Sequence, residues 1–159
     1  MIGFGTIRPG EWDIPLFLHV LGAFVLIGSA ALAATFLFAA ARDGSASNLR
    51  LALRTLTIGV IPSWIVLRVA AEWIADKEGF ADLDEPPSWI NIGYIASELG
   101  FLLIIVSSLL AWFTLRRVRA DDGDAEAAPS SAVRAAAILL AVVLVLQVVA
   151  LWAMTTKPT

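Results

Sequence analysis

Four long apolar blocks, separated by short polar segments, dominate the sequence. They cover residues 15–41, 51–75, 90–115 and 135–154. A helix needs about 20 mostly apolar residues to cross the hydrocarbon of a bilayer. In lipid every backbone polar group must be bonded internally, and the blocks lack the period-of-two alternation of β-barrel strands, so each block is predicted to be a helix. The sequence therefore predicts an all-α fold, a transmembrane four-helix bundle that forms a single membrane domain.

Composition supports a membrane protein and narrows its chemistry. The chain is 59% hydrophobic and 16% charged, against about 45–50% and about 25% in soluble domains. It has no cysteine and one histidine, which excludes thiolate sites and, within one chain, multi-histidine metal sites. No basic stripe indicates nucleic acid. Without a Ser-His-Asp set, a metal-ligand motif or a phosphate loop, we do not expect an enzyme.

The distribution of lysine and arginine predicts the orientation. Cytoplasmic loops of membrane proteins carry the excess of these residues. Seven of them lie around the first and third loops, and three lie at the termini and in the second loop. The seven are Arg42, Arg50, Arg54, Arg116, Arg117, Arg119 and Arg134. We therefore expect a multi-pass protein of a bacterial-type inner membrane, with the N-terminus and the C-terminus outside.

Each predicted span contributes one polar side chain to a layer near its outer end. At a rise of about 1.5 Å per residue, this layer lies about 6–12 Å inside the outer edge. Charged and polar groups within spans are costly, so by default they indicate a functional site. Two further polar residues share a helix face with members of the layer, one turn away. The predicted ligand-binding residues are His19, Arg68, Glu72, Tyr94, Glu98 and Gln147.

The same residues also have a structural interpretation. An ion pair between Arg68 and Glu98 can fix the register of two helices without serving a ligand. Arg68 can instead extend towards the headgroups with Glu72 as its partner four residues along the helix. His19 can be satisfied by a hydrogen bond to Glu98 or to water. The pattern alone leaves both interpretations open.

Two segments carry a family resemblance. The stretch PLFLHVLGAFVLIGSAALA, which begins at Pro15 and contains the Leu18-His19 pair, and the stretch WINIGYIASELGFLLII, which begins at Trp89, resemble a large group of uncharacterised bacterial four-helix membrane proteins. The chain is also distantly similar to the membrane domains of copper-resistance D proteins and to haem-handling membrane proteins whose first helix carries a histidine. The resemblance implies the four-helix fold and assigns no activity.

Three functions remain as hypotheses. The first is a binding module that holds a small ligand or cofactor in the outer polar layer, since bundle interiors commonly host such sites. The second is transport of protons or of a small solute by an oligomer. The third is an accessory structural subunit of a larger membrane complex. The first is the interpretation that the polar layer favours, with the lipid bilayer as the surrounding partner in all three.

One version of the binding hypothesis is a b-type haem. His19 near the outer end of the first span and Met154 near the outer end of the fourth form a candidate pair of axial ligands. In this version Arg68 would meet a haem propionate. The cofactor itself is not identified by any motif in the sequence.

The predicted orientation can be tested with accessibility tags. A tag at either terminus should react with an impermeant reagent on intact cells, whereas a tag inserted beside Gly123, in the third loop, should react only after lysis. The reason is that seven Lys and Arg residues lie around the first and third loops, against three at the termini and in the second loop. Labelling of Gly123 on intact cells would contradict the assignment.

Overall fold

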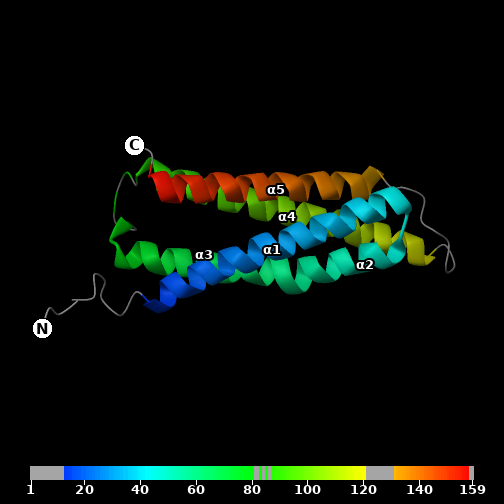
Figure 1. Ribbon diagram of the computed structural model, residues 1–159, viewed down its shortest axis with the longest axis horizontal. Helices are drawn as coiled ribbons and strands as arrows, with labels where there is room; N and C mark the ends of the chain where they lie inside the picture. Colours follow the sequence, from blue (N-terminus) through cyan, green and yellow to red (C-terminus); the bar gives the residue numbers. More distant parts are fainter. Residues whose placement is uncertain (1–12, 81–82, 84, 86, 121–130, 158–159) are drawn as a thin grey trace, which may run out of the picture.

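The protein is a bundle of four long helices that run alternately in opposite directions (Figure 1). The computed structural model describes residues 13–80, 83, 85, 87–120 and 131–157. The elements are α1 (Asp13–Asp43), α2 (Ala46–Thr55), a π-helical segment (Leu56–Val60), α3 (Ile61–Lys77), α4 (Ser88–Ala120) and α5 (Ser131–Thr156). Residues 46–77 form one continuous rod. The all-α, four-helix prediction is confirmed, and each rod is long and apolar enough to span a membrane.

The helices extend past the predicted spans at both ends. Helix α1 has 31 residues and α4 has 33. At about 1.5 Å per residue, a helix of this size is more than 45 Å long, whereas the hydrocarbon core is about 30 Å thick. Hydropathy marks only the part of a helix that lies in hydrocarbon. The excess length therefore places a turn or more of each long helix at headgroup depth on each side.

A tight turn reverses the chain between α1 and α2. Gly44 has a φ of 68°, a left-handed conformation that glycine adopts without steric cost. Its amide donates to the carbonyl of Ala40 at 3.0 Å and so closes the end of α1. The Ser45 hydroxyl then accepts from the amide of Asn48 at 3.3 Å and caps α2. The two helices are consequently antiparallel neighbours.

The second rod is irregular just before Pro62. Proline lacks an N–H group, and its ring collides with the carbonyl four residues earlier in a regular helix. The π-helical segment ends two residues before this proline, and one-turn π segments commonly accommodate such interruptions. Gly59 lies in this segment, where an added Cβ would come within 2.8 Å of the Ser29 Cβ. The irregular turn therefore coincides with a close approach to α1.

The four long helices form two pairs: α1 with the rod of α2 and α3, and α4 with α5. Helix α1 also connects the pairs through its contact with α5. Helix α1 packs on α2 and α3, α4 packs on α5, and α1 also contacts α5, whereas α3 and α4 contact each other sparingly. Figure 1 shows α1 crossing the bundle diagonally, beside α3 where it begins and close to α5 where it ends. The densest core lies in the second half of α1 and the first half of α5. Its largest fully buried side chains are Leu26, Leu37, Leu56, Ile104 and Leu140.

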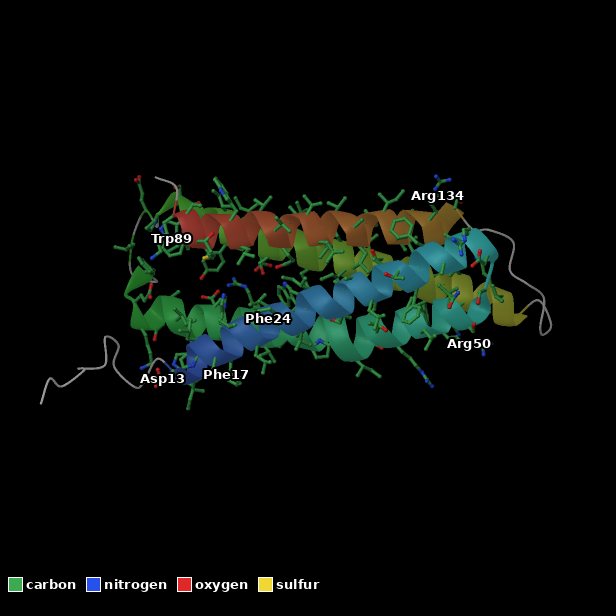
Figure 2. The ribbon with its side chains drawn as sticks, viewed as in Figure 1. Asp13, Phe17, Phe24, Arg50, Trp89 and Arg134 are labelled. Carbon is green, nitrogen blue, oxygen red and sulfur yellow. The ribbon has the colours of Figure 1, made fainter. Side chains whose placement is uncertain are left out.

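One end of the bundle, here called the terminal end, holds the beginning of α1 and the end of α5. Asp13 lies there, whereas Arg50 and Arg134 lie at the opposite end (Figure 2). The basic residues of the first and third loops are thus gathered at one end, as the sequence predicts. The side of the membrane that the terminal end faces stays a prediction.

Gly22 allows α1 and α3 to approach closely at the terminal end. An added Cβ would lie 3.0 Å from the backbone nitrogen of Leu67 and 3.1 Å from its Cα. Backbone atoms cannot move aside as a flexible side chain can. Small residues on a helix face permit such close approach of two helix backbones, and Gly22 does so here.

Replacing Gly22 by valine should therefore destabilise the bundle. We expect a loss of about 1–3 kcal/mol in the free energy of unfolding, the usual cost of overpacking. Gly28 is a matched control in the same helix, because an added Cβ there meets nothing within 4 Å. Gly28→Val should change stability by less than about 0.5 kcal/mol. Denaturant titrations of both variants in detergent, followed by circular dichroism, provide the measurement, and equal losses would contradict this account of the α1–α3 contact.

Candidate functional site

A cavity of about 470 Å³ lies at the terminal end, where the two helix pairs separate. All of its walls come from α1, α3, α4 and α5 and from the residues at the ends of these helices. Most of the lining side chains are apolar. Figure 2 shows Phe24 beside the space between the two pairs and Trp89 at the terminal end of that space. The side chains of the four helices leave this space unfilled, and it is open at the surface of the bundle.

A charged cluster centred on Arg68 connects α3 to α4 beside the cavity. Arg68 Nε donates to Glu98 Oε1 at 2.9 Å, and Arg68 also forms an ion pair with Glu72. The Tyr94 hydroxyl donates to Glu72 Oε2 at 3.1 Å, and the guanidinium lies 4.4 Å from the centre of the Tyr94 ring. Two carboxylates and one aromatic face thus hold a single guanidinium in place.

The members of this cluster face different surroundings. Arg68 and Tyr94 line the cavity, whereas Glu72 and Glu98 are not among its lining residues. The Arg68 side chain is 23% exposed, and those of Glu72 and Glu98 are 52% and 56% exposed. The two carboxylates therefore contact the guanidinium from outside the cavity. Their predicted role at the site becomes the indirect one of holding Arg68.

His19 lies on α1, one turn before Gly22. Its ring lies against the backbone of Leu67 in α3, because Gly22 draws the two helices together there. The imidazole lines the cavity, and its Nδ1 is buried with no hydrogen-bond partner in the protein. A buried polar atom without a partner costs free energy, about 1–3 kcal/mol in proteins. This nitrogen is therefore the polar atom whose environment is least satisfied by the protein itself.

Gln147 and Met154 contribute from α5. Gln147 is buried, with 8% of its surface exposed, and lines the cavity. Its Nε2 would lie 3.6 Å from a Cβ added to Gly100, an ordinary contact distance, so the amide lies beside this glycine of α4. Met154 lines the cavity too, and its methyl group fills the space beside Gly93. The predicted residues His19, Arg68, Tyr94, Gln147 and Met154 thus surround one cavity.

Aromatic side chains and a lysine close the terminal end of the cavity. The rings of Phe80 and Trp89 meet edge to face with centroids 5.7 Å apart, and the Lys157 ammonium lies 5.1 Å from the centre of the Trp89 ring. All three residues line the cavity. Gly79, with a φ of 73°, turns the chain immediately before Phe80. Leu83, in the same loop, is exposed, and nothing in the sequence placed Lys157 here.

A second bridge joins α3 to α4 on the side of the charged cluster. Trp64 Nε1 donates to the carbonyl of Ser97 at 3.2 Å, and its ring stacks on Phe101 with centroids 3.9 Å apart. Together with the Arg68–Glu98 pair, Trp64 closes the side of the cavity between two helices whose backbones otherwise meet sparingly.

Comparison of the chain with protein-family models, with curated proteins and with solved structures gave no match. The resemblance to four-helix bacterial membrane proteins therefore stays a prediction. Within the described parts of the chain, no group of three or more His, Cys, Asp or Glu side chains is arranged to hold a metal ion. The geometry of the cavity is therefore the observation from which a function can be inferred.

The charged cluster predicts strong coupling between its two carboxylates. Glu72→Gln or Glu98→Gln alone should cost no more than about 1 kcal/mol, since the other carboxylate still neutralises Arg68. The double variant leaves the guanidinium without a counter-charge, and it should cost at least about 1 kcal/mol more than the sum of the single changes. Unfolding titrations in detergent measure all three values.

Asp43 provides a control for the removal of a carboxylate elsewhere. It pairs with Arg42 at the opposite end of α1, where both side chains are exposed. Asp43→Asn should change stability by a few tenths of a kcal/mol and should show no coupling to Glu98→Gln. Strict additivity of Glu72→Gln and Glu98→Gln would show that the two carboxylates do not share Arg68.

Proposed function

We propose that this protein is a membrane binding module that holds a small ligand in the cavity at the terminal end of the bundle. The observation that carries the proposal is the cavity itself, with apolar walls, a few convergent polar groups and the buried, unpartnered Nδ1 of His19. Ligand sites in proteins have this composition, and typical volumes are about 300–1,000 Å³. A ligand would fill a space that the side chains leave open.

The packing beyond the cavity supports binding over passage through the chain. In the described residues, the buried polar side chains other than Gln147 are Ser63 and Ser107. Ser63 donates to the carbonyl of Val60 and Ser107 to that of Ala136, so both hydroxyls are engaged within the bundle. The remaining core between the cavity and the opposite end is apolar. Transport by this chain would need a path supplied by other subunits.

The distribution of basic residues supports a place for the site in the outer half of the membrane. The terminal end is opposite the end that carries Arg50 and Arg134 (Figure 2). The positive-inside rule therefore directs the terminal end outwards. The exposed apolar side chains along all four helices suit contact with lipid. In a bacterial-type inner membrane, the ligand would then be held on the periplasmic side.

A b-type haem is a second candidate, favoured by one observation. His19 and Met154, the predicted axial ligands, line the same cavity. Arg68, however, is already bound by two carboxylates, which compete with any propionate. An absorption spectrum of the purified protein, oxidised and reduced, decides the matter, because bound haem gives an intense Soret band.

The proposal predicts that a cavity-filling variant loses a co-purifying compound. Ala150 lines the cavity from α5, and Ala150→Phe should fill part of it. Val148, two residues earlier in α5, is 64% exposed and faces away from the core, so Val148→Phe is the matched control. Organic extracts of the two purified variants and of the wild-type protein are compared by mass spectrometry. We expect a compound that is enriched at least about tenfold in the wild-type and Val148→Phe extracts over the Ala150→Phe extract.

The measurement requires that all three proteins be folded. Helical content and unfolding midpoints in detergent establish this before extraction. Identical extracts from the three folded proteins, together with a spectrum that shows only aromatic side chains, would overturn the proposed function.

A further inference from the structure

We propose that the ligand is an uncharged amphiphile whose carbonyl oxygen is held by Arg68 and Gln147, and whose apolar chain reaches the bilayer between α1 and α5. This inference rests on the proposed function and specifies its ligand class. It follows from three features of the cavity: the donors that face it, the charge around Arg68, and the residues that form its open side.

The first feature is a surplus of hydrogen-bond donors. A guanidinium carries five N–H groups, and the contacts of Arg68 with Glu72, Glu98 and Tyr94 do not use all of them. Gln147 adds an amide from the facing helix, and its amino group can donate two hydrogen bonds. The Tyr94 hydroxyl donates to Glu72 and so offers no donor to a ligand. An acceptor on the ligand, such as a carbonyl oxygen, complements Arg68 and Gln147 together.

The second feature is the charge around the donors. Glu72 and Glu98 give the cluster one more carboxylate than guanidinium. At the closed terminal end, Glu78 and Lys157 carry opposite charges, and both line the cavity. An anionic head would therefore enter a site with no uncompensated positive charge and would have to displace a carboxylate from Arg68. A neutral carbonyl accepts a charge-assisted hydrogen bond from Arg68 and leaves both ion pairs intact.

The third feature is the open side of the cavity. Val20, Phe24 and Leu151 line the cavity and are also exposed on the surface of the bundle. They belong to α1 and α5, which separate towards the terminal end (Figure 1). On the facing side, the Arg68–Glu98 and Trp64–Ser97 bridges close the gap between α3 and α4. In a membrane the open side consists of apolar side chains and faces lipid, so an apolar chain extends into the bilayer without exposure to water.

Two classes of membrane compound share this chemistry. One is a prenyl quinone, whose ring carbonyl would meet Arg68 and whose prenyl chain would pass Phe24. The other is a lipid acyl ester, with the ester carbonyl in the same place. The His19 ring lines the same cavity and offers apolar contact to either head. Both classes are uncharged at the group that Arg68 would hold, which is the property that the proposal requires of the ligand.

The test compares a neutral and an anionic probe of the same chain length with a second neutral probe. The protein in detergent is titrated at pH 8.5 with a dibrominated 18-carbon fatty acid methyl ester, with the corresponding free acid, and with a benzoquinone that carries a ten-carbon chain. All three probes quench tryptophan fluorescence, and Trp89 lines the cavity. The component of the quenching that saturates and that is lost in Ala150→Phe and in Trp89→Phe reports binding in the cavity.

We expect saturable binding of the ester or of the quinone at least about tenfold tighter than binding of the acid. Gln147→Leu, which removes one donor, should weaken the neutral probe about three- to tenfold, the size of one net hydrogen bond. Val148→Leu, at the exposed neighbouring position of α5, should leave its affinity unchanged. Tighter binding of the quinone than of the ester supports the quinone source, and the reverse order supports the lipid ester.

Several outcomes overturn the ligand class. Binding of the acid as tight as that of the ester would show that the cluster accepts anions. A Soret band in the purified protein would assign the cavity to haem. Absence of saturable binding by both neutral probes would also overturn the class, while a co-purifying compound that Ala150→Phe excludes would leave the proposed function standing. The two proposals can therefore fail separately.

Discussion

The Arg68 guanidinium joins the two halves of the bundle at the end where α3 and α4 have little backbone contact. Its ion pair with Glu98 crosses from α3 to α4, and its pair with Glu72 holds the side chain on its own helix. A charge this far along a span is expensive unless it is paired. Because both partners come from the side away from the cavity, the guanidinium can face the cavity without losing its counter-charges. The shape of the site and the absence of an uncompensated positive charge in it both depend on this arrangement.

The length of the helices explains why exposed carboxylates are tolerated at this position. Helix α4 begins at Ser88, so Glu98 lies ten residues along it, about 15 Å from its end. Helices longer than about 45 Å extend roughly 8 Å beyond the hydrocarbon on each side. Glu98 is then within a turn or so of the headgroups, and Glu72, nearer the end of its helix, lies at the boundary. Water and headgroups can solvate the carboxylates there, whereas the same pair at the bilayer centre would need complete burial.

The polar side chains of the site could be predicted from the sequence, but its boundaries could not. Arg68, Glu98, His19 and Gln147 interrupt long apolar runs, and the fixed rise of a helix places them at one depth. Helical periodicity puts Glu72 and Arg68 on one face but does not say whether that face meets the cavity. The positions of Trp89 and Lys157 depend on how a loop and a helix end fold over the bundle, and hydropathy carries no such information. Gly22 and Gly59 allow α1 to pack closely on the second rod while it diverges from α5. The boundaries of the spans alone do not predict such close contacts.

Because the cavity opens towards lipid, the affinity that a bilayer-dissolved ligand needs for high occupancy is lower than for a ligand from water. A compound dissolved in the bilayer is confined to a thin layer, so its local concentration near the open side is far above its average concentration in the sample. Modest affinity then suffices for high occupancy, and the few donors on Arg68 and Gln147 can provide selectivity for the head group. The apolar walls add little discrimination, since lipid chains already occupy an apolar solvent. Under the proposed function, selectivity would therefore reside in the polar cluster, where two carboxylates leave Arg68 no uncompensated positive charge and so favour uncharged head groups.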